Sequence, residues 1–117
     1  MTLNEAGVKI RENLTDDLRK PEYQGHSNKY RGHCYVASEA LYHLAAKKMG
    51  YKPAIVKVEG ETHWFLRKKE DYEYLVIHLT KRQYPMLFID YSKARGCGFL
   101  TKGPSKRAQK LMERVFK

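Results

Sequence analysis

The stretch of residues 34–50 reads CYVASEALYHLAAKKMG. Its apolar residues recur at the spacing of one helical face: Ala37, Ala40, Leu41, Leu44 and Ala45. Lys47 and Lys48 fall in the last turn, and Gly50 suits a helix end because glycine readily adopts the left-handed conformation. The stretch therefore predicts an amphipathic helix from Cys34 to Met49, with Cys34 in its first turn.

The segments that follow this helix have the composition of β-strands. Three of them are short, rich in β-branched or aromatic residues, and separated by polar or glycine-containing turns: Ala54–Glu59, Thr62–Arg67 and Tyr74–Leu79. We expect three antiparallel strands and a fourth, shorter one over Phe88–Tyr91. The glycines within Arg95–Gly98 predict an irregular loop.

Helices are also expected at both ends of the chain. Thr2 and Glu5 have the spacing of a capping box, and apolar residues continue at helical spacing from about Leu3 to Leu18. A second periodic stretch covers Ser105–Phe116. The sequence thus predicts one α+β domain over residues 1–117, in which a Cys-bearing helix packs on a small antiparallel sheet between N- and C-terminal helices.

Length and hydropathy limit the class of protein. The chain has 117 residues with 42% hydrophobic content, and its apolar runs are far shorter than the roughly 20 residues needed to cross a bilayer. Residues 1–20 carry four acidic side chains and lack the apolar segment of a secretory signal. We expect a cytoplasmic protein with no membrane partner and with Cys34 and Cys97 both reduced.

The strong positive charge predicts an acidic partner. The net charge is +10, and residues 101–117 supply half of it with six Lys or Arg against one Glu. Such a surface suits an acidic protein surface, a peptide substrate, or a nucleic acid bound through Lys106, Arg107 and Lys110. Sequence signatures of an RNA-recognition or helix-turn-helix module do not accompany the charge.

Cys34 is the candidate nucleophile. The first turn of a helix stabilises a thiolate through unpaired backbone N–H groups and the helix dipole. A nearby imidazole must then accept the thiol proton and later protonate a leaving group. Among the histidines, His33 is expected to point elsewhere at the helix start and His43 lies beyond the second turn. His63, in a predicted strand, is the better base.

The strand pairing suggests a third member of the site. A turn centred between Glu70 and Asp71 would set His63 directly opposite His78, with Cβ atoms about 4.5 to 5.5 Å apart. His78 could then orient the His63 imidazole, and Asp90 is an alternative orienting group. The Cys34 backbone N–H would form an oxyanion hole with a side chain from the preceding loop, either Gln24 or Asn28.

Four stretches resemble a known family. They are Gly32-His33-Cys34-Tyr35-Val36-Ala37, Thr62-His63-Trp64-Phe65, Ile77-His78-Leu79-Thr80 with Gln83-Tyr84, and Gly96-Cys97-Gly98-Phe99-Leu100. In these residues the chain resembles the YunG-like small bacterial and phage proteins, whose order of Cys, His and Asp is similar to NlpC/P60 and transglutaminase-like, papain-like cysteine enzymes. The resemblance implies that Cys34 and His63 form the centre, while His78 stands where the family has Asp.

The leading hypothesis is a cysteine-dependent hydrolase or acyltransferase that acts on an amide or ester without a cofactor. The alternatives are that Cys34 only packs in the core, that Cys34, His63 and His78 hold zinc, or that an impaired papain-like scaffold acts as a basic binding protein, such as a phage-encoded inhibitor of a host factor or a nucleic-acid-associated protein. Trp64 and Tyr74 are interpreted as core residues, and Cys97 as structural.

Overall fold

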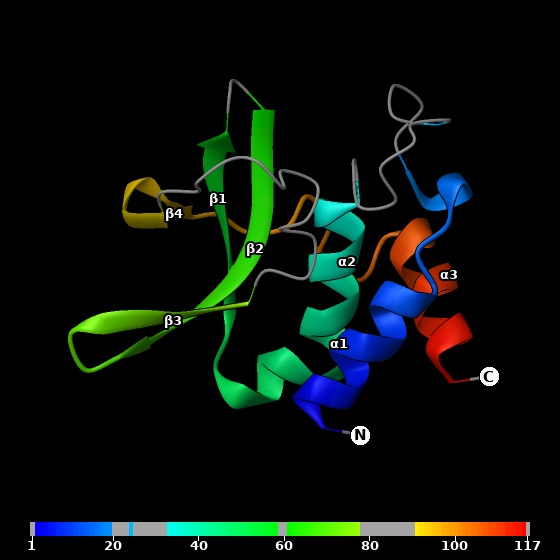
Figure 1. Cartoon of the computed structure of the whole chain (residues 1–117), viewed down its shortest axis with the longest axis horizontal. Helices are drawn as coiled ribbons and strands as arrows, with labels where there is room; N and C mark the ends of the chain where they lie inside the picture. The colour runs from blue at the N-terminus through cyan, green and yellow to red at the C-terminus, as the bar shows by residue number, and fades with distance from the viewer. Residues whose placement is uncertain (1, 20–23, 25–32, 59–60, 78–90, 117) are drawn as a thin grey trace.

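Helix α2 (Cys34–Leu41) is the element around which the others are arranged. The computed structural model describes residues 2–19, 24, 33–58, 61–77 and 91–116. Every residue of α2 is buried, and the helix lies between the sheet on one side and α1 (Leu3–Glu12) and α3 (Lys106–Val115) on the other (Figure 1). The expected Cys-bearing helix on a small antiparallel sheet, flanked by terminal helices, is confirmed.

Residues 34–49 form a continuous helix as predicted, but the type of helical turn changes along it. After Leu41 the chain continues as a π-helical turn, η3 (Tyr42–Ala46), and then as a 3-10 turn, η4 (Lys47–Met49). Gly50 ends it with a φ of 90°, in the left-handed region that glycine enters at little cost.

Helix α1 begins as predicted and ends earlier. The Thr2 hydroxyl accepts a hydrogen bond from the Glu5 backbone N–H at 3.1 Å, which caps the first turn. The expected end at Leu18 is wrong because Asn13 stops the helix, its side-chain amide donating to the Lys9 carbonyl at 2.7 Å. A 3-10 turn, η1 (Asp16–Leu18), follows.

Within the described residues the sheet has four antiparallel strands in the order β3-β2-β1-β4. They are β1 (Lys52–Val58), β2 (Glu61–Glu70), β3 (Glu73–Ile77) and β4 (Arg95–Gly96). The three main strands are confirmed.

The fourth strand differs from its prediction. Residues 88–90 lie outside the described residues, and Tyr91 begins a 3-10 turn, η6 (Tyr91–Lys93), instead of ending a strand. The loop expected at residues 95–98 instead contains β4, whose two residues pair with Ile55 and Ala54. The pairing covers the edge of β1 with a short strand, and the composition of residues 95–98 alone does not indicate that strand.

The β2–β3 hairpin has a different register from the one expected. Leu66 pairs with Ile77 and Glu70 with Glu73, so the turn is centred between Asp71 and Tyr72, one residue later than predicted. Asp71 has a φ of 49°, a left-handed conformation that Asp tolerates better than most residues. The turn position from which the pairing of His63 with His78 was predicted is therefore wrong, and His78 itself lies outside the described residues.

Two buried clusters flank β2. The helical core joins α1, α2 and α3, and it also takes in Leu66 of β2. The sheet core lies on the other face and contains Ala54, Val56, Val58 and Phe65, with Tyr91 packed against it. Within the part of the chain that the structure describes, no helix is both long and apolar enough to span a bilayer.

A buried carboxylate joins α2 to α3. Glu39 is fully buried, and its two oxygens accept hydrogen bonds from the Ser105 backbone N–H and hydroxyl, each at 2.7 Å. The Ser105 hydroxyl in turn accepts from the Ala108 N–H at 3.3 Å, which caps α3. Nearby, the Tyr35 hydroxyl accepts from the Leu100 N–H at 2.8 Å.

We expect Glu39→Ala to lower the free energy of unfolding by about 1–3 kcal/mol, because both Ser105 donors would lose a buried acceptor. Ser105→Ala should cost about 1 kcal/mol through the lost cap. The double variant should lose less than the sum of the two, since both changes remove the hydrogen bond between the Ser105 hydroxyl and Glu39. Urea denaturation measures all three, with the exposed Glu113→Ala as a control that should cost under about 0.5 kcal/mol. If Glu39→Ala lowers the free energy of unfolding no more than the control does, the bonds between Glu39 and Ser105 do not stabilise the fold.

Candidate active site at the start of helix α2

Cys34 is the first residue of α2. The preceding His33 carbonyl accepts the first helical hydrogen bond, from the Ala37 N–H at 2.9 Å. The Cys34 side chain is 7% exposed, and Cys34 and Cys97 are not joined in a disulfide. The thiol thus lies at a helix start, where the backbone favours negative charge.

The thiol side of α2 lies along one edge of β2. The Cys34 thiol contacts the Thr62 carbonyl oxygen at 3.9 Å, and the Ser38 hydroxyl donates to the Trp64 carbonyl at 3.2 Å. Alternate residues of a strand direct their carbonyls to the same edge, so these two contacts align α2 along β2. Cys34 is consequently held beside the residue that precedes His63.

His63 is fully buried on β2, where it pairs with Val56 of β1. Its ring is stacked 6.1 Å from the Phe65 ring, confirming that the two residues share a face. Trp64 points to the other face and meets Tyr35 of α2 at 4.8 Å between ring centroids. The edge of β2 that contacts Cys34 therefore lies between the Trp64–Tyr35 aromatic pair on one face of the strand and the His63 ring on the other face.

Tyr91 is a neighbour of His63 that the sequence did not predict. The two ring centroids are 6.4 Å apart, and Tyr91 also meets Phe65 edge-on at 4.9 Å. Burial raises the pKa of Tyr91 to about 12, so its hydroxyl stays protonated at neutral pH. The signal in the sequence was its position directly after Asp90, a residue already considered for this site.

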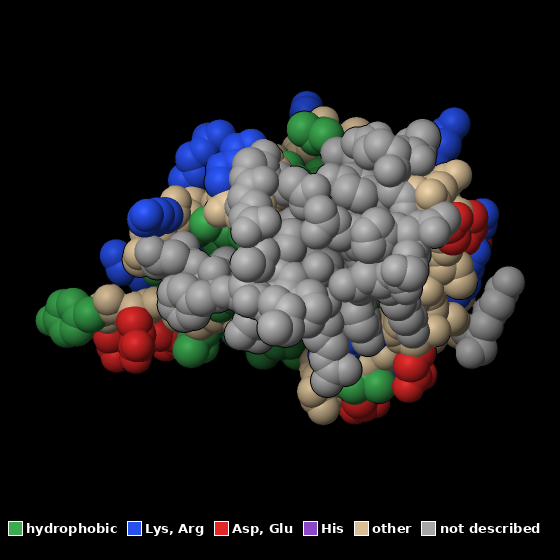
Figure 2. Space-filling view, turned by 45° about the horizontal axis from the view of Figure 1, so that its top comes forward, with side chains coloured by type: hydrophobic (Ala, Val, Ile, Leu, Met, Phe, Trp, Pro, Cys, Tyr) green, Lys and Arg blue, Asp and Glu red, His purple; other side chains and the backbone are tan. Residues whose placement is uncertain are grey.

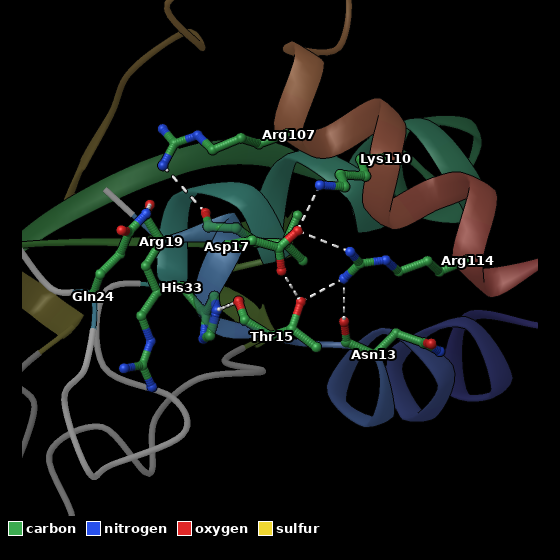
Figure 3. A network of polar contacts seen from close by, with 10 residues as sticks. Asn13, Thr15, Asp17, Arg19, Gln24, His33, Arg107, Lys110 and Arg114 are labelled. Atoms are coloured by element: carbon green, nitrogen blue, oxygen red, sulfur yellow. Dashed lines mark hydrogen bonds and ion pairs between the residues drawn. The ribbon is translucent and has the colours of Figure 1, made fainter. Parts of the chain in front are cut away.

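The other candidates have separate positions. His33 points away from the site, as expected, with Nε2 2.8 Å from the Thr15 carbonyl oxygen (Figure 3). Gln24 is exposed, and its side-chain amide donates to the Arg19 carbonyl at 3.3 Å. Asn28, His78 and Asp90 lie outside the described residues. Among the residues that are described, no three His, Cys, Asp or Glu side chains gather as metal ligands.

Most basic side chains of α3 bond to other parts of the same chain. Lys110 and Arg114 both contact the Asp17 carboxylate, at 2.6 and 2.9 Å, and Arg107 donates to the Leu18 carbonyl at 3.2 Å (Figure 3). The Thr15 hydroxyl also donates to Asp17. These contacts dock α3 on η1, so two of the three cations expected to bind a partner already have internal partners, while Lys106 is exposed.

Two other expectations concern Tyr74, predicted to lie in the core, and Cys97, predicted to be structural. Tyr74 is 46% exposed, so its assignment to the core is wrong. The hairpin register explains this, because it places Tyr74 opposite Lys69 near the turn and away from the sheet core. Cys97 lines an open pocket of about 390 Å³ together with Tyr42, His43 and Phe99.

Comparison of the chain with protein-family models, with curated proteins and with solved structures found no match.

The Asp17 contacts predict a pH-dependent contribution to stability. Hydrogen bonds from Lys110, and then from Thr15 and Arg114, hold the pKa of Asp17 well below its usual range. A depressed carboxyl pKa stabilises the folded state above the ordinary value of about 4, and this contribution is lost as the pH falls below it.

We therefore expect Asp17→Asn to cost about 0.5–1 kcal/mol at pH 7, a modest amount because the carboxylate is partly exposed. The difference in free energy of unfolding between this variant and the wild type should narrow as the pH drops below about 4. Urea denaturation between about pH 2 and pH 7, a range that spans the ordinary carboxyl pKa of about 4, provides the measurement, with the exposed Glu12→Gln as a charge-matched control. A constant gap at every pH would be inconsistent with the ion pairs.

Proposed function

We propose that this chain is a cysteine-dependent hydrolase or acyltransferase acting on an amide or ester, with Cys34 as nucleophile and His63 as base. The observation that carries the proposal is the contact between the Cys34 thiol, at the start of α2, and the Thr62 carbonyl beside the buried His63. A thiol at a helix start and a histidine on the adjoining strand are two of the elements that thiol activation uses. Membership of the YunG-like, papain-like group remains part of this proposal.

In the proposed reaction the Cys34 thiol transfers its proton to the His63 imidazole. The thiolate then attacks the acyl carbon, forming a C–S bond while the carbonyl oxygen becomes negatively charged. Collapse of this intermediate expels the amine or alcohol, which takes the proton from His63 and leaves an acyl-thioester on Cys34. Water, or another acceptor, deprotonated by His63 then releases the acyl group and restores the thiol.

The oxyanion and the imidazole need further partners in this scheme. The Cys34 backbone N–H is one oxyanion donor, as in related mechanisms, and Asn28 is the proposed second donor because the Gln24 amide is engaged with Arg19. His78 or Asp90 is proposed to orient His63. Tyr91, protonated and packed near His63, adds a second positioning group.

A purely basic binding role through Lys106, Arg107 and Lys110 has less support. Arg107 and Lys110 are bonded to η1, and releasing them for a partner would break contacts that dock α3.

The proposed centre predicts that Cys34 stays reactive at mildly acidic pH. In a Cys97→Ser background, alkylation of Cys34 by iodoacetamide should fall by less than tenfold between pH 8.5 and pH 6, because an imidazolium partner keeps the thiolate populated. An ordinary thiol with a pKa of about 8.5 slows by roughly 100-fold over the same interval. Restricted access slows alkylation of the buried thiol by the same factor at both pH values, so the ratio of the two rates does not depend on it.

His63→Gln in the same background should restore the steep pH dependence. Hydrolysis of p-nitrophenyl acetate should disappear in Cys34→Ser and persist in Cys97→Ser, which serves as the matched control. The proposal is wrong if Cys34 follows the pH dependence of free cysteine, or if ester hydrolysis survives its removal.

A further inference from the structure

A basic groove runs across the end of the sheet that lies away from the sheet core. It consists of two adjoining pockets of about 390 and 450 Å³, which share Lys52, Pro53 and Gly96. The cations that line the groove are Lys52, Arg67, Lys68, Lys69 and Lys102. The described lining residues include no Asp or Glu, and the one lining cation with a nearby carboxylate is Lys68, whose ammonium lies 3.3 Å from Glu70. The groove therefore presents mainly positive charge to solvent.

Strand register explains why these cations lie together. Lys52 of β1 pairs with Arg67 of β2, and Lys69 of β2 pairs with Tyr74 of β3. Residues two apart on a strand share a face, so Arg67 and Lys69 flank the Tyr74 ring. The Arg67 guanidinium lies 4.1 Å from the centroid of that ring, and the Lys69 ammonium lies 5.9 Å from it.

The groove also offers flat aromatic surfaces. Tyr74 is about half exposed at one end, while Tyr42, His43 and Phe99 line the other end. Burial lowers the pKa of His43, which keeps its ring neutral near pH 7. Cations interleaved with accessible rings are the pattern that recognises phosphates and unstacked bases together.

The wider surface has the same sign of charge. Figure 2 shows Lys and Arg side chains gathered over the end of the molecule where β1 and β4 lie, apart from the acidic side chains at the hairpin tip. The whole chain carries a net charge of +10. Long-range attraction would therefore bring a polyanion to this end of the protein.

From these observations we propose that the basic groove binds single-stranded nucleic acid. Lys52, Arg67 and Lys69 would contact phosphates, and a base would stack on the exposed side of Tyr74. An acidic peptide would satisfy the cations without needing the ring. A duplex would satisfy them while keeping its bases stacked inside the helix. Tyr74 therefore distinguishes the proposed ligand from the other two.

The experiment measures fluorescence anisotropy of a labelled oligothymidylate or oligouridylate against the full-length protein over a range of salt concentrations. Lys52→Gln with Lys69→Gln should weaken binding at least tenfold at low salt. It should also reduce the slope of log affinity against log salt by about 1.4, because each neutralised phosphate of a single strand accounts for about 0.7. Lys9→Gln with Lys106→Gln removes the same charge from exposed positions outside the groove and should change the affinity less than twofold.

A second pair of variants tests stacking. Tyr74→Ala should weaken binding about tenfold, in line with the loss of one stacked base. Tyr72→Ala removes a fully exposed ring from the adjacent hairpin turn and should have little effect. Thermal melting verifies that each variant is folded.

Three results would overturn the proposal: equal loss in the two double-lysine variants, equal loss in the two tyrosine variants, or displacement of the oligonucleotide by polyglutamate or duplex DNA as effectively as by unlabelled single strand. The measurement does not depend on Cys34 chemistry, since Cys34→Ser should bind as the wild type does.

Discussion

The complete burial of α2 is the constraint on which the rest of the structure depends. A helix surrounded by protein must satisfy each polar side chain it carries, because an unpaired buried group is costly. Ser38 donates to β2 and Glu39 accepts from the start of α3. His33, just before the helix, bonds to Thr15 in the segment after α1. Each bond joins α2 to a different part of the chain, so together they set its position and direction.

This arrangement determines the surroundings of Cys34. The thiol cannot move far from β2, since Ser38 one turn later holds the helix to the same strand edge. In the ground state the thiol donates to the Thr62 carbonyl at 3.9 Å. The proposed chemistry therefore depends on His63 to draw the proton away, and the helix start then stabilises the thiolate that results.

Basic residues have two different roles in the molecule. Those of α3 hold two helical segments together, because Asp17 lies within reach of both Lys110 and Arg114. Those of the sheet end line an open groove whose described walls lack carboxylates. The difference comes from the position of acidic neighbours in space, which the total charge of the chain does not reveal.

Periodicity and end signals in the sequence determined the helix beginning at Cys34, its glycine stop, the capped N-terminal helix, the C-terminal helix and the three main strands. These features depend on local physical preferences: helical spacing of apolar residues, hydroxyl caps, the conformational freedom of Gly50, and β-branched or aromatic runs. The sequence also correctly grouped His63 with Phe65, because alternation along a strand is itself local.

Tertiary structure alone decided how these parts meet. The pairing of β4 with the edge of β1 joins residues about forty positions apart in the chain, whereas the end of α1 at Asn13 and the left-handed turn at Asp71 are local details that composition and periodicity did not reveal. The approach of Tyr91 to His63, the use of Arg107 and Lys110 inside the molecule, and the exposure of Tyr74 all depend on contacts between residues distant in sequence. Such contacts arise from packing and charge pairing in three dimensions, and the local pattern around each residue does not encode its distant neighbour.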